Sequence, residues 1–483
     1  MRFPLTLCAA AILAYWVHSA LAAEPLLLNN AEFAQWQDRA PVGWSVSVGA
    51  KSGGDVPSRL QKADGGGIEL SGDAATGQWR VVSQKVAIGK EGGLRLQFEA
   101  STADLQRERG QFDNCYVGLN VVDAGGKRAT FAFRNLFETK WAPGQVVVNL
   151  PASAAAVEVM LVLSKSGKLQ VRNLRLEQLA PADSFDVLAA ELDRYYSFFA
   201  LKKFDWRARA AVYEAQGRAA KTPDEFIAAV QPLLAELKDL HVVIVADGGK
   251  ETPTYISRAD RNFDARTIAG KLKDVKQIGR MGFTARTPEG YGYAALGTLA
   301  ADEKTTAEML AAVDALLDAK GLILDIRVNG GGQEGVAQQI VSRLIGQPLA
   351  YAKNQFRGGA AHDDLVTLGT RQVAPRLDQP FRGPVVGLIG PGCVSSGEGM
   401  ALMLKALPNA TLIGQNTRGA SGNPQPVALP NGLTVRYSTW VPLDMEGQPF
   451  EGTGIQPATR IDDDSTGVKG LQAAIEHLNQ ATK

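Results

Sequence analysis

The hydrophobic pattern of the chain changes its period near residue 180, and no other feature of the sequence constrains the fold as strongly. Up to about Leu179, apolar residues alternate with polar ones in short runs, which is typical of half-buried β-strands. From Ser184 they recur at helical spacing, and from about Met281 strand-like and helical runs alternate. A chain of 483 residues with these successive patterns is predicted to form several domains of different classes.

The first 22 residues have the pattern of an export signal. Arg2 gives a basic start, Leu5–Val17 is an apolar run, and Ala20–Ala22 has the A-x-A form of a cleavage site. The alternative is an ordinary N-terminal helix. The run of 13 residues is too short to cross a bilayer, which needs about 20. We therefore expect residues 1–22 to be removed and the protein to be exported, periplasmic or secreted, without a membrane span.

Residues 23–180 are predicted to form a β-sandwich, because short alternating runs are separated by Gly- and Asp-rich breaks such as Asp123–Gly126. The segment resembles jelly-roll domains of the carbohydrate-binding and galactose-binding type in its opening, Asn30–Phe33 and Pro41–Trp44, and in its closing run, Val171–Glu177. The expected strands are Leu94–Phe98, Tyr116–Val122, Thr130–Phe133, Val146–Leu150, Val157–Leu163 and Leu169–Leu176.

Three tryptophans of this segment have two possible roles. Trp36, Trp79 and Trp141 are candidates for stacking against a sugar, as the resemblance implies. The alternative is that they anchor the core or turns of a domain that only packs against its neighbour. A glycan is therefore a second possible partner, through the sandwich.

Residues 181–245 are predicted to form a helical subdomain, because Phe185–Phe199 places apolar residues at helical spacing. Thr222–Glu225 is a helix start, with Thr as N-cap, Pro in the first turn and Glu closing a capping box. The helix that follows leads to His241, after which Val242–Val245 reads as a strand. His241 is therefore expected where a helix gives way to a strand.

Residues 246–285 are predicted to connect this subdomain to a layered α/β core over residues 286–483, in which strands and helices alternate. The expected strands are Tyr291–Leu296, Gly321–Arg327, Val385–Ile389, Thr411–Gly414 and Leu433–Val441, and the expected helices are Thr305–Leu317, Val336–Ile345 and Gly399–Leu407.

Composition narrows the classes of function. Lys and Arg number 51 against 50 Asp and Glu, so the net charge of +1 gives no case for a nucleic-acid binder. Three cysteines exclude a disulfide scaffold, and no closely spaced cysteine pairs suggest a zinc site. The sequence gives no sign of a metal or organic cofactor, so none is expected. Of four histidines, three remain after removal of the signal. Besides His241, these are His362, expected in a solvated loop, and His477, expected in a polar C-terminal helix.

Two loops at strand ends carry candidate chemistry. Asp325–Gly332 ends in three glycines, which let the backbone turn sharply and present N–H groups to an anion; by itself it is also an ordinary tight turn. In Gly390–Glu398, Ser395 lies at a helix start that suits a nucleophile whose target becomes an oxyanion. The alternative is that Ser395 and Glu398 form only a capping box. The G-x-S-x-G elbow of α/β-hydrolases is absent, because Cys393 occupies the first glycine position.

Together these segments resemble the serine peptidase family of C-terminal (tail-specific) processing proteases and the tricorn core protease, over residues 184 to 460. Six motifs occur in the order of the family, and the set makes a chance match improbable. They are F-D…Y-Y…F-D-W (Phe185–Trp206), L-x-D-x-H (Leu237–His241), L-D-I-R-V-N-G-G-G (Leu324–Gly332), G-P-V-V-G-L-I-G…S-S-G-E-G (Gly383–Gly399), G-Q-N-T-R-G (Gly414–Gly419) and F-E-G-T-G-I-Q-P (Phe450–Pro457).

The resemblance implies a crotonase/ClpP-like layered core and a serine endopeptidase whose nucleophile is Ser395. One branch of the family activates its serine with a lysine 25 positions later, where this chain has Ala420. The resemblance therefore favours the histidine-dependent, tricorn-like branch, with His241 as base and Glu451 orienting it. The oxyanion hole is expected from the N–H groups of Ser396 and Gly331, and Cys393 is expected to be a small buried neighbour.

Two departures from the family pattern affect this interpretation. Leu240 stands where the tricorn type has a serine that relays between histidine and glutamate. About 40 residues, Ala246–Ala285, fill the place of the peptide-binding PDZ module, which is too few for one, so recognition of a substrate's C-terminus is in doubt. The expected partner is a peptide or protein substrate. The alternative is a non-catalytic ligand- or glycan-binding protein, since retinoid-binding proteins of the eye share the fold.

Overall fold

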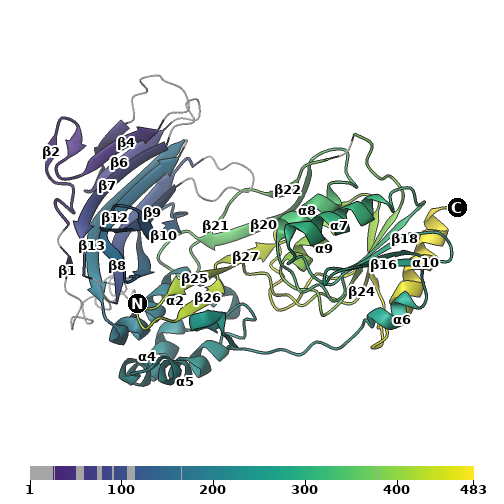
Figure 1. Ribbon diagram of the computed structural model, residues 1–483. Coiled ribbons are helices and arrows are strands. Elements are labelled where there is room, and N and C mark those ends of the chain that lie inside the picture. The colour runs from purple at the N-terminus through teal and green to yellow at the C-terminus, as the bar shows by residue number, and fades with distance from the viewer. Residues whose placement is uncertain are drawn as a thin grey trace, which may run out of the picture.

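The computed structural model describes residues 25–26, 28–49, 59–72, 79–89, 92–105, 115–164, 166–376 and 378–483. The predicted signal, residues 1–22, lies outside the described residues. An N-terminal β part and a C-terminal α/β part lie at opposite ends of the molecule, and a helical part lies beside the β part (Figure 1).

The β part consists of two antiparallel sheets that enclose one core. The first sheet runs β11 (Ala142–Asn149), β8 (Gly93–Ala103), β13 (Gly167–Leu179), β6 (Ile68–Gly72) and β5 (Arg59–Lys62), with β1 (Pro25–Leu26) on β13. The second runs β10 (Arg128–Asn135), β9 (Cys115–Asp123), β12 (Ala154–Ser164), β7 (Trp79–Ala87) and β4 (Ser45–Gly49), and β2 (Trp36–Gln37) pairs with β3 (Ala40–Pro41). The strands predicted over residues 94–176 are confirmed.

Alternation produces this sandwich in the expected way. Along β12, Val157, Val159 and Leu161 are fully buried in the core, while Glu158 points out and accepts a hydrogen bond from Ser83 Oγ at 2.8 Å. Side chains two residues apart lie on one face of a strand, so this alternation fixes the register of the sheet.

Two of the three tryptophans have partners within the domain. Trp36 Nε1 donates to Phe33 O at 2.6 Å, and the guanidinium of Arg172 lies 4.2 Å from the ring centroid of Trp141. The side chain of Trp79 lies outside the described residues. Trp36 and Trp141 therefore have roles in a turn and in a cation–π contact.

The helical part begins with the 3₁₀ turn η1 (Pro181–Asp183) and continues through α2 (Ser184–Tyr195), α3 (Phe199–Lys202), α4 (Trp206–Ala219) and α5 (Pro223–Ala235). Thr222 caps α5 as predicted, since its hydroxyl accepts the N–H of Glu225 at 3.2 Å. The helical spacing of Phe185–Phe199 corresponds to two helices, α2 and the start of α3, and not to one. The backbone of Tyr196 is extended, and Ser197 N–H donates to Ser438 O at 3.2 Å, so a tertiary contact interrupts the helix.

A small antiparallel sheet, here called the bridging sheet, joins the helical part to the late sequence. It runs β15 (Glu251–Pro253), β14 (Val243–Val245), β26 (Thr434–Ser438) and β25 (Pro424–Ala428), and the turn η2 (Asp247–Gly249) connects β14 to β15. A further sheet contains β20 (Leu349–Arg357), β21 (Leu365–Thr367), β22 (Arg371–Val373) and β27 (Trp440–Leu443). The one strand predicted over Leu433–Val441 is therefore two, because the chain bends at Thr439, whose N–H donates to Gly422 O at 2.9 Å.

The α/β part is built on a mixed sheet that is parallel from β18 to β28. Its order is β16 (Lys273–Ile278), β17 (Gly282–Arg286), β18 (Gly292–Leu296), β19 (Leu322–Asp325), β23 (Val385–Ile389), β24 (Ala410–Gly414) and β28 (Thr459–Arg460). Helices α7 (Glu303–Asp314), α8 (Glu334–Val341) and α9 (Ser396–Ala406) cover one face, and α6 (Ala265–Ala269) and α10 (Val468–Ala481) the other (Figure 1). Leu322 and Leu324 accordingly face α7–α9, and Ile323 faces α10.

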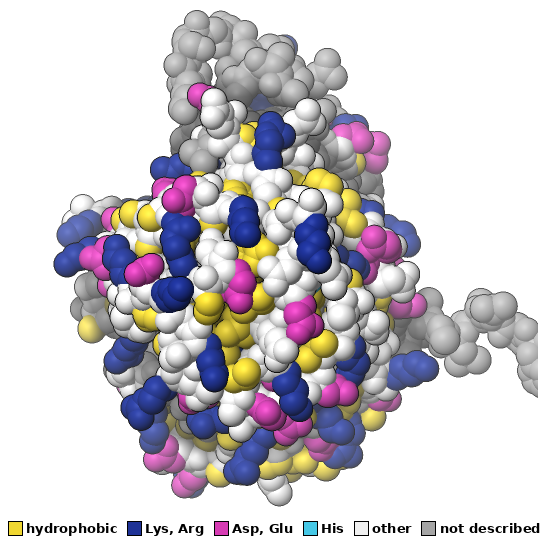
Figure 2. Space-filling model, turned by 90° about the vertical axis from the view of Figure 1, so that its right-hand side faces the viewer, with side chains coloured by type: hydrophobic (Ala, Val, Ile, Leu, Met, Phe, Trp, Pro, Cys, Tyr) yellow, Lys and Arg dark blue, Asp and Glu magenta, His cyan; other side chains and the backbone are white. Residues whose placement is uncertain are grey.

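The segment predicted as a connection, Ala246–Ala285, also contributes to this sheet, because β16 and most of β17 lie in it. Buried ion pairs hold the β part against the helical part: Arg134 contacts Glu191, and Arg194 contacts Glu138. Among the described residues, no helix is both long and apolar enough to cross a membrane. On the face near α10, Lys and Arg side chains are interspersed with Asp and Glu (Figure 2), so this face carries no extended basic patch.

Candidate active site

Ser395 lies at a strained turn between β23 and α9. Its backbone angles are φ 55° and ψ −126°, a conformation that costs a residue with a side chain roughly 1–3 kcal/mol and is found mainly at functional sites. Its N–H donates to Ala420 O at 2.7 Å, and it makes no side-chain capping hydrogen bond. The strand–turn–helix geometry of a nucleophile elbow is therefore present although the G-x-S-x-G motif is not. Cys393 is fully buried, as predicted.

The glycine loop lies directly against this serine. A Cβ added to Gly331 would lie 2.8 Å from Ser395 Cβ, so a side chain there would collide with Ser395. Gly331 N–H, however, donates to Asn329 Oδ1 at 2.9 Å, so this predicted oxyanion donor is already occupied. Ser396 Oγ donates to Gly332 O at 2.7 Å. Within the described part of the chain nothing accepts the N–H of Ser396 or of Gly332, and these two donors are available to an anion.

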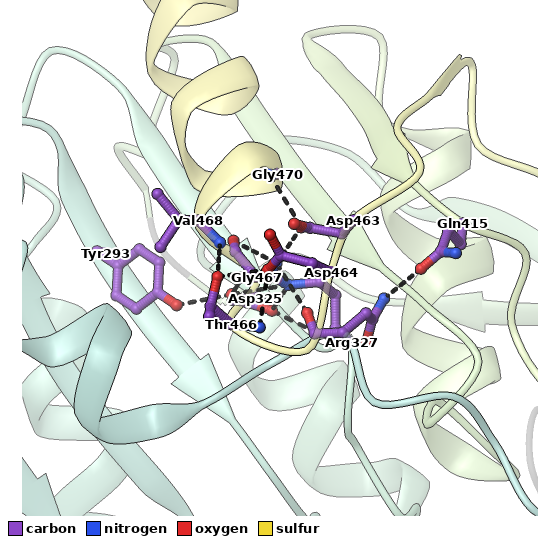
Figure 3. A network of polar contacts seen from close by, with 11 residues as sticks. Tyr293, Asp325, Arg327, Gln415, Asp463, Asp464, Thr466, Gly467, Val468 and Gly470 are labelled. Carbon is purple, nitrogen blue, oxygen red and sulfur yellow. Dashed lines mark hydrogen bonds and ion pairs between the residues drawn. The ribbon is translucent and has the colours of Figure 1, made fainter.

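A buried ionic network anchors the start of the same loop (Figure 3). Arg327 is fully buried and donates to Asp325 Oδ1 at 2.9 Å and to Asp463 Oδ2 at 2.8 Å. It also donates to Gly467 O at 2.7 Å, and Tyr293 OH donates to Asp325 Oδ2 at 2.6 Å. Arg327 thereby ties the strand end that precedes the glycine loop to the start of α10.

Replacement of Arg327 by methionine is expected to destabilise the α/β part by about 3–5 kcal/mol, because two buried carboxylates lose their cation. The thermal unfolding midpoint should fall by about 10 °C in calorimetry. The matched control is Arg460→Met, which removes an exposed pair with Asp462 and should cost at most about 1 kcal/mol. Equal shifts for the two variants would show that the buried network does not stabilise the fold.

His241 lies in the turn between α5 and β14, as predicted. The backbone N–H of His241 donates to Asp239 Oδ1 at 2.9 Å, and the ring Nδ1 lies 3.7 Å from the same oxygen. No described residue forms a hydrogen bond with Nδ1. Burial lowers the pKa of His241 below its ordinary value, against the opposing charge of Asp239. The imidazole is therefore neutral near pH 7, the state in which it can accept a proton.

Glu451 belongs to the same cluster, where its ion-pair partner is a lysine. Its Oε1 lies 3.3 Å from Lys202 Nζ, which also donates to Leu237 O at 2.9 Å, in the segment that leads to His241. No ion pair between these described residues joins Glu451 to His241. Burial, and then the charge of Asp239, raise the pKa of Glu451. The carboxylate nearest to the His241 ring nitrogens is that of Asp239.

Glu398 holds the loop that contacts Ser395. Its carboxylate accepts hydrogen bonds from Thr417 Oγ1 at 2.6 Å, Gly419 N–H at 2.6 Å and Ala420 N–H at 2.9 Å. Burial raises the pKa of Glu398 to about 7. Ala420 O in turn accepts Ser395 N–H, so Glu398 holds the backbone of the residue that contacts Ser395. Ser395 makes no side-chain capping hydrogen bond, so Ser395 and Glu398 do not complete the capping box of the alternative interpretation.

The structure thus brings the predicted residues together in two groups. Ser395, Ser396 and Gly331 form one group, and His241 and Glu451 form the other, through Asp239 and Lys202. Among the described residues no hydrogen bond joins Ser395 Oγ to the His241 ring.

The other two histidines of the described chain lie outside both groups. His362 lies in the loop between β20 and β21, as predicted, but it is half-buried: its Nε2 lies 3.0 Å from Asp193 Oδ1, and its ring lies 4.6 Å from that of Phe199. His477 lies in α10, as predicted.

Sequence reasoning missed Lys202, Asn329 and the site roles of Asp239 and Glu398. Asp239 has a signal, its place in L-x-D-x-H, and Glu398 lies in the S-S-G-E motif. Lys202 and Glu451 are separated by about half of the chain, and a contact over such a separation leaves no local pattern.

Comparison with known proteins supports the resemblance for the C-terminal part. Residues 290–461 match the model of peptidase family S41, and this range contains Ser395 and Glu451 but not His241. The carboxy-terminal processing protease CtpA of Bacillus subtilis (strain 168) is 26% identical over 162 residues, which are 33% of this chain and 33% of CtpA. The chain thus matches about a third of the length of this curated relative.

Solved structures include a candidate peptidase from Parabacteroides merdae ATCC 43184, with 27% identity and a TM-score of 0.54. The match covers 62% of this chain and 97% of that one. The photosystem II D1 C-terminal processing protease is 16% identical with a TM-score of 0.39, over 59% of this chain and 94% of that one. The similarity to C-terminal processing proteases rests on the family model over residues 290–461 and on the match to CtpA.

Proposed function

We propose that the protein is an exported serine endopeptidase in which Ser395 attacks the peptide carbonyl. The observation that carries the proposal is the strained turn that presents Ser395 beside two N–H groups with no partner among the described residues, those of Ser396 and Gly332. Similarity to family S41 over residues 290–461 supports the same reaction class. The proposed substrate is a peptide or protein.

His241 is the proposed general base. A serine hydroxyl is a weak nucleophile until a neighbouring base takes its proton, and the base then returns that proton to the leaving amine. The neutral imidazole of His241 has the required state. Catalytic hydrogen bonds are often long before substrate binds, so the contact between His241 and Ser395 is proposed to form in the substrate complex. With Ala420 beside Ser395, no lysine is available there, which supports the histidine-dependent, tricorn-like branch.

The N–H of Ser396 is one proposed donor to the oxyanion of the tetrahedral intermediate. The second proposed donor is Gly332 N–H in the present conformation. Gly331 N–H could take this role only after its hydrogen bond to Asn329 Oδ1 is broken. One such donor typically contributes about 3 kcal/mol to transition-state stabilisation. The glycine loop is therefore proposed to act in the chemical step.

Asp239 and Glu451 are proposed to share the acidic role of the triad, with Asp239 facing His241 Nδ1 and Glu451 acting from further away. Asp239→Asn is then expected to lower kcat by about 10²–10⁴-fold, while Glu451→Gln should lower it by about tenfold. Both replacements keep the shape of the side chain, and Asn retains the oxygen that accepts His241 N–H. Steady-state kinetics on one peptide substrate measure both values. A larger decrease in kcat for Glu451→Gln than for Asp239→Asn would show that Glu451, and not Asp239, orients the histidine.

Labelling with a fluorophosphonate probe tests the function. The probe reacts with activated serines, and digestion followed by mass spectrometry locates the modified residue. We expect modification of Ser395 and none of Ser396, and loss of labelling in His241→Ala. A folded protein that takes up no probe would overturn the peptidase proposal and favour the alternative, a non-catalytic binding protein on the same fold.

A further inference from the structure

A cavity of about 550 Å³ lies between the sandwich and the bridging sheet, outside the two groups of site residues. Three strands supply most of its wall: β10 and β11 from the two sheets of the sandwich, and β25 from the bridging sheet. Its size is within the range of cavities that hold small ligands or a few residues of peptide.

Each of these strands lies at the edge of its sheet. Within the described part of the chain, β10 pairs only with β9, β11 only with β8, and β25 only with β26. Edge strands carry N–H and C=O groups that can pair with an additional strand, which is how many proteins bind extended peptides. The cavity is thus lined by backbone edges suited to an extended peptide.

Apolar side chains line the same wall. The rings of Phe131 and Phe133 stack at 5.4 Å, and Phe133 is 45% exposed although phenylalanine is usually buried. Val427 of β25 lines the cavity as well. Alternate side chains of an added strand would contact these groups.

Arg357 supplies a charge without a counterion. It lines the cavity and is 3% exposed, and no carboxylate of a described residue lies within ion-pair distance of it. It donates only to the carbonyls of Asp193, Tyr196 and Ala360, each at 3.3 Å, and its Nε has no partner. Burial, and next the charge of Arg194, lower the pKa of Arg357 to about 10. An anionic ligand would stabilise a buried guanidinium that has no carboxylate partner, through charge-assisted hydrogen bonds.

The other ionised groups of the wall are already neutralised. Arg134 pairs with Glu191, and Glu138 pairs with Arg194. Arg357 is therefore the charged side chain of this wall that a ligand can satisfy.

The cavity is close to the nucleophile. Ala420 O accepts Ser395 N–H, and Asn423, three residues later, lines the cavity. Three residues span at most about 11 Å, so a peptide held at Ser395 can reach the cavity within a few residues. Thr439, which also lines the cavity, donates its N–H to Gly422 O at 2.9 Å and so fixes this connection.

We propose that this cavity is a substrate subsite for an extended peptide segment that carries a carboxylate. The segment adds to a free strand edge, and its carboxylate pairs with Arg357. A neutral glycan would use neither the strand edges nor the unpaired charge. The inference rests on the proposed peptidase function, since it assigns the substrate class of the same site.

Binding to the full chain carrying Ser395→Ala tests the subsite, since the probe is not hydrolysed. The probe is a hexapeptide of alternating valine and threonine, labelled at its N-terminus with a net-neutral dye and followed by fluorescence anisotropy. Three forms are compared: the free acid, the C-terminal amide, and the amide with one threonine replaced by glutamate. We expect at least one carboxylate form to bind about tenfold or more tightly than the plain amide. Which form does so identifies the carboxylate as terminal or side-chain.

Variants then locate the binding. Arg357→Gln should bring the carboxylate forms to the affinity of the amide and leave the amide unchanged, which also shows that the variant is folded. Phe133→Asp, at an already exposed position, should weaken all three forms. Arg175→Gln, an exposed arginine of β13, is the matched control and should change nothing.

The proposal is overturned if the three forms bind alike, if none binds, or if Arg357→Gln keeps the difference. Displacement of the peptide by maltohexaose would overturn it in favour of a glycan site. If Arg357→Gln does not fold, unchanged binding in Phe133→Asp overturns the proposal. Because Ser395 is replaced throughout, none of these results depends on whether Ser395 is the nucleophile, which the fluorophosphonate experiment decides separately.

Discussion

Replacement of Ser395 by alanine is expected to reduce peptide hydrolysis by about 10⁵-fold, because the hydroxyl that forms the acyl-enzyme is removed. The residual rate would come from the oxyanion donors and from substrate binding. The measurement is kcat on a fluorogenic peptide, with burst-phase kinetics of the parent to detect the acyl-enzyme.

Cys393 provides the control for this variant. It lies two residues before Ser395, but burial raises the pKa of its thiol well above the ordinary value, so the reactive thiolate is disfavoured. Cys393→Ala should keep hydrolysis within a few-fold of the parent. If activity follows Cys393 and survives Ser395→Ala, the nucleophile is misassigned.

Backbone strain at Ser395 can be tested by comparing the stability of two variants of this residue. Glycine adopts φ near +55° without steric cost, so Ser395→Gly should be as inactive as Ser395→Ala but more stable than it. A stability gain that accompanies loss of activity is expected where strain serves function. A lower unfolding midpoint for Ser395→Gly would show that the turn is not strained in solution.

Periodicity predicts those elements whose burial is decided locally. Along β12 every second side chain faces the same core, so alternation reveals the strand, whereas β19 is recognised as a short apolar run that is buried on both faces. The strand β16 has the sequence Lys-Asp-Val-Lys-Gln-Ile and is exposed over most of its length, so its apolar pattern is absent and only pairing with β17 defines it. The break after α2 depends on Ser438 O, far along the chain, and no local signal announces it.

The same distinction applies to the candidate site. Ser395, His241 and the glycine loop lie in contiguous motifs, and the sequence locates them. Side-chain contacts decide the rest: Asn329, two residues away, accepts Gly331 N–H, and the distant Lys202 pairs with Glu451. The sequence thus predicts which residues gather, while the packing decides which carboxylate faces the histidine.

Replacement of His241 by alanine is expected to lower kcat by about 10⁴-fold or more, because the variant removes the proposed base. The fold should stay intact, because no described residue forms a hydrogen bond with His241 Nδ1. Circular dichroism and the unfolding midpoint check the fold. His362→Ala is the control, because His362 also has a ring nitrogen next to an aspartate, Asp193. This variant should leave kcat within a few-fold of the parent value.

The pH dependence of kcat/KM provides the independent test of the same assignment. The pKa of His241 is lowered, so the fraction of neutral imidazole, and with it the rate, should stay high as the pH falls to about 6.5 and decline only below that value. The two buried glutamates have raised pKa values, so a requirement for their ionised form would place the decline near pH 7 or above. A decline in that higher range that disappears in Glu451→Gln would assign the controlling group to Glu451. A decline below pH 6.5 that persists in Glu451→Gln is the expected result, and it would leave His241 as the group whose protonation stops the reaction.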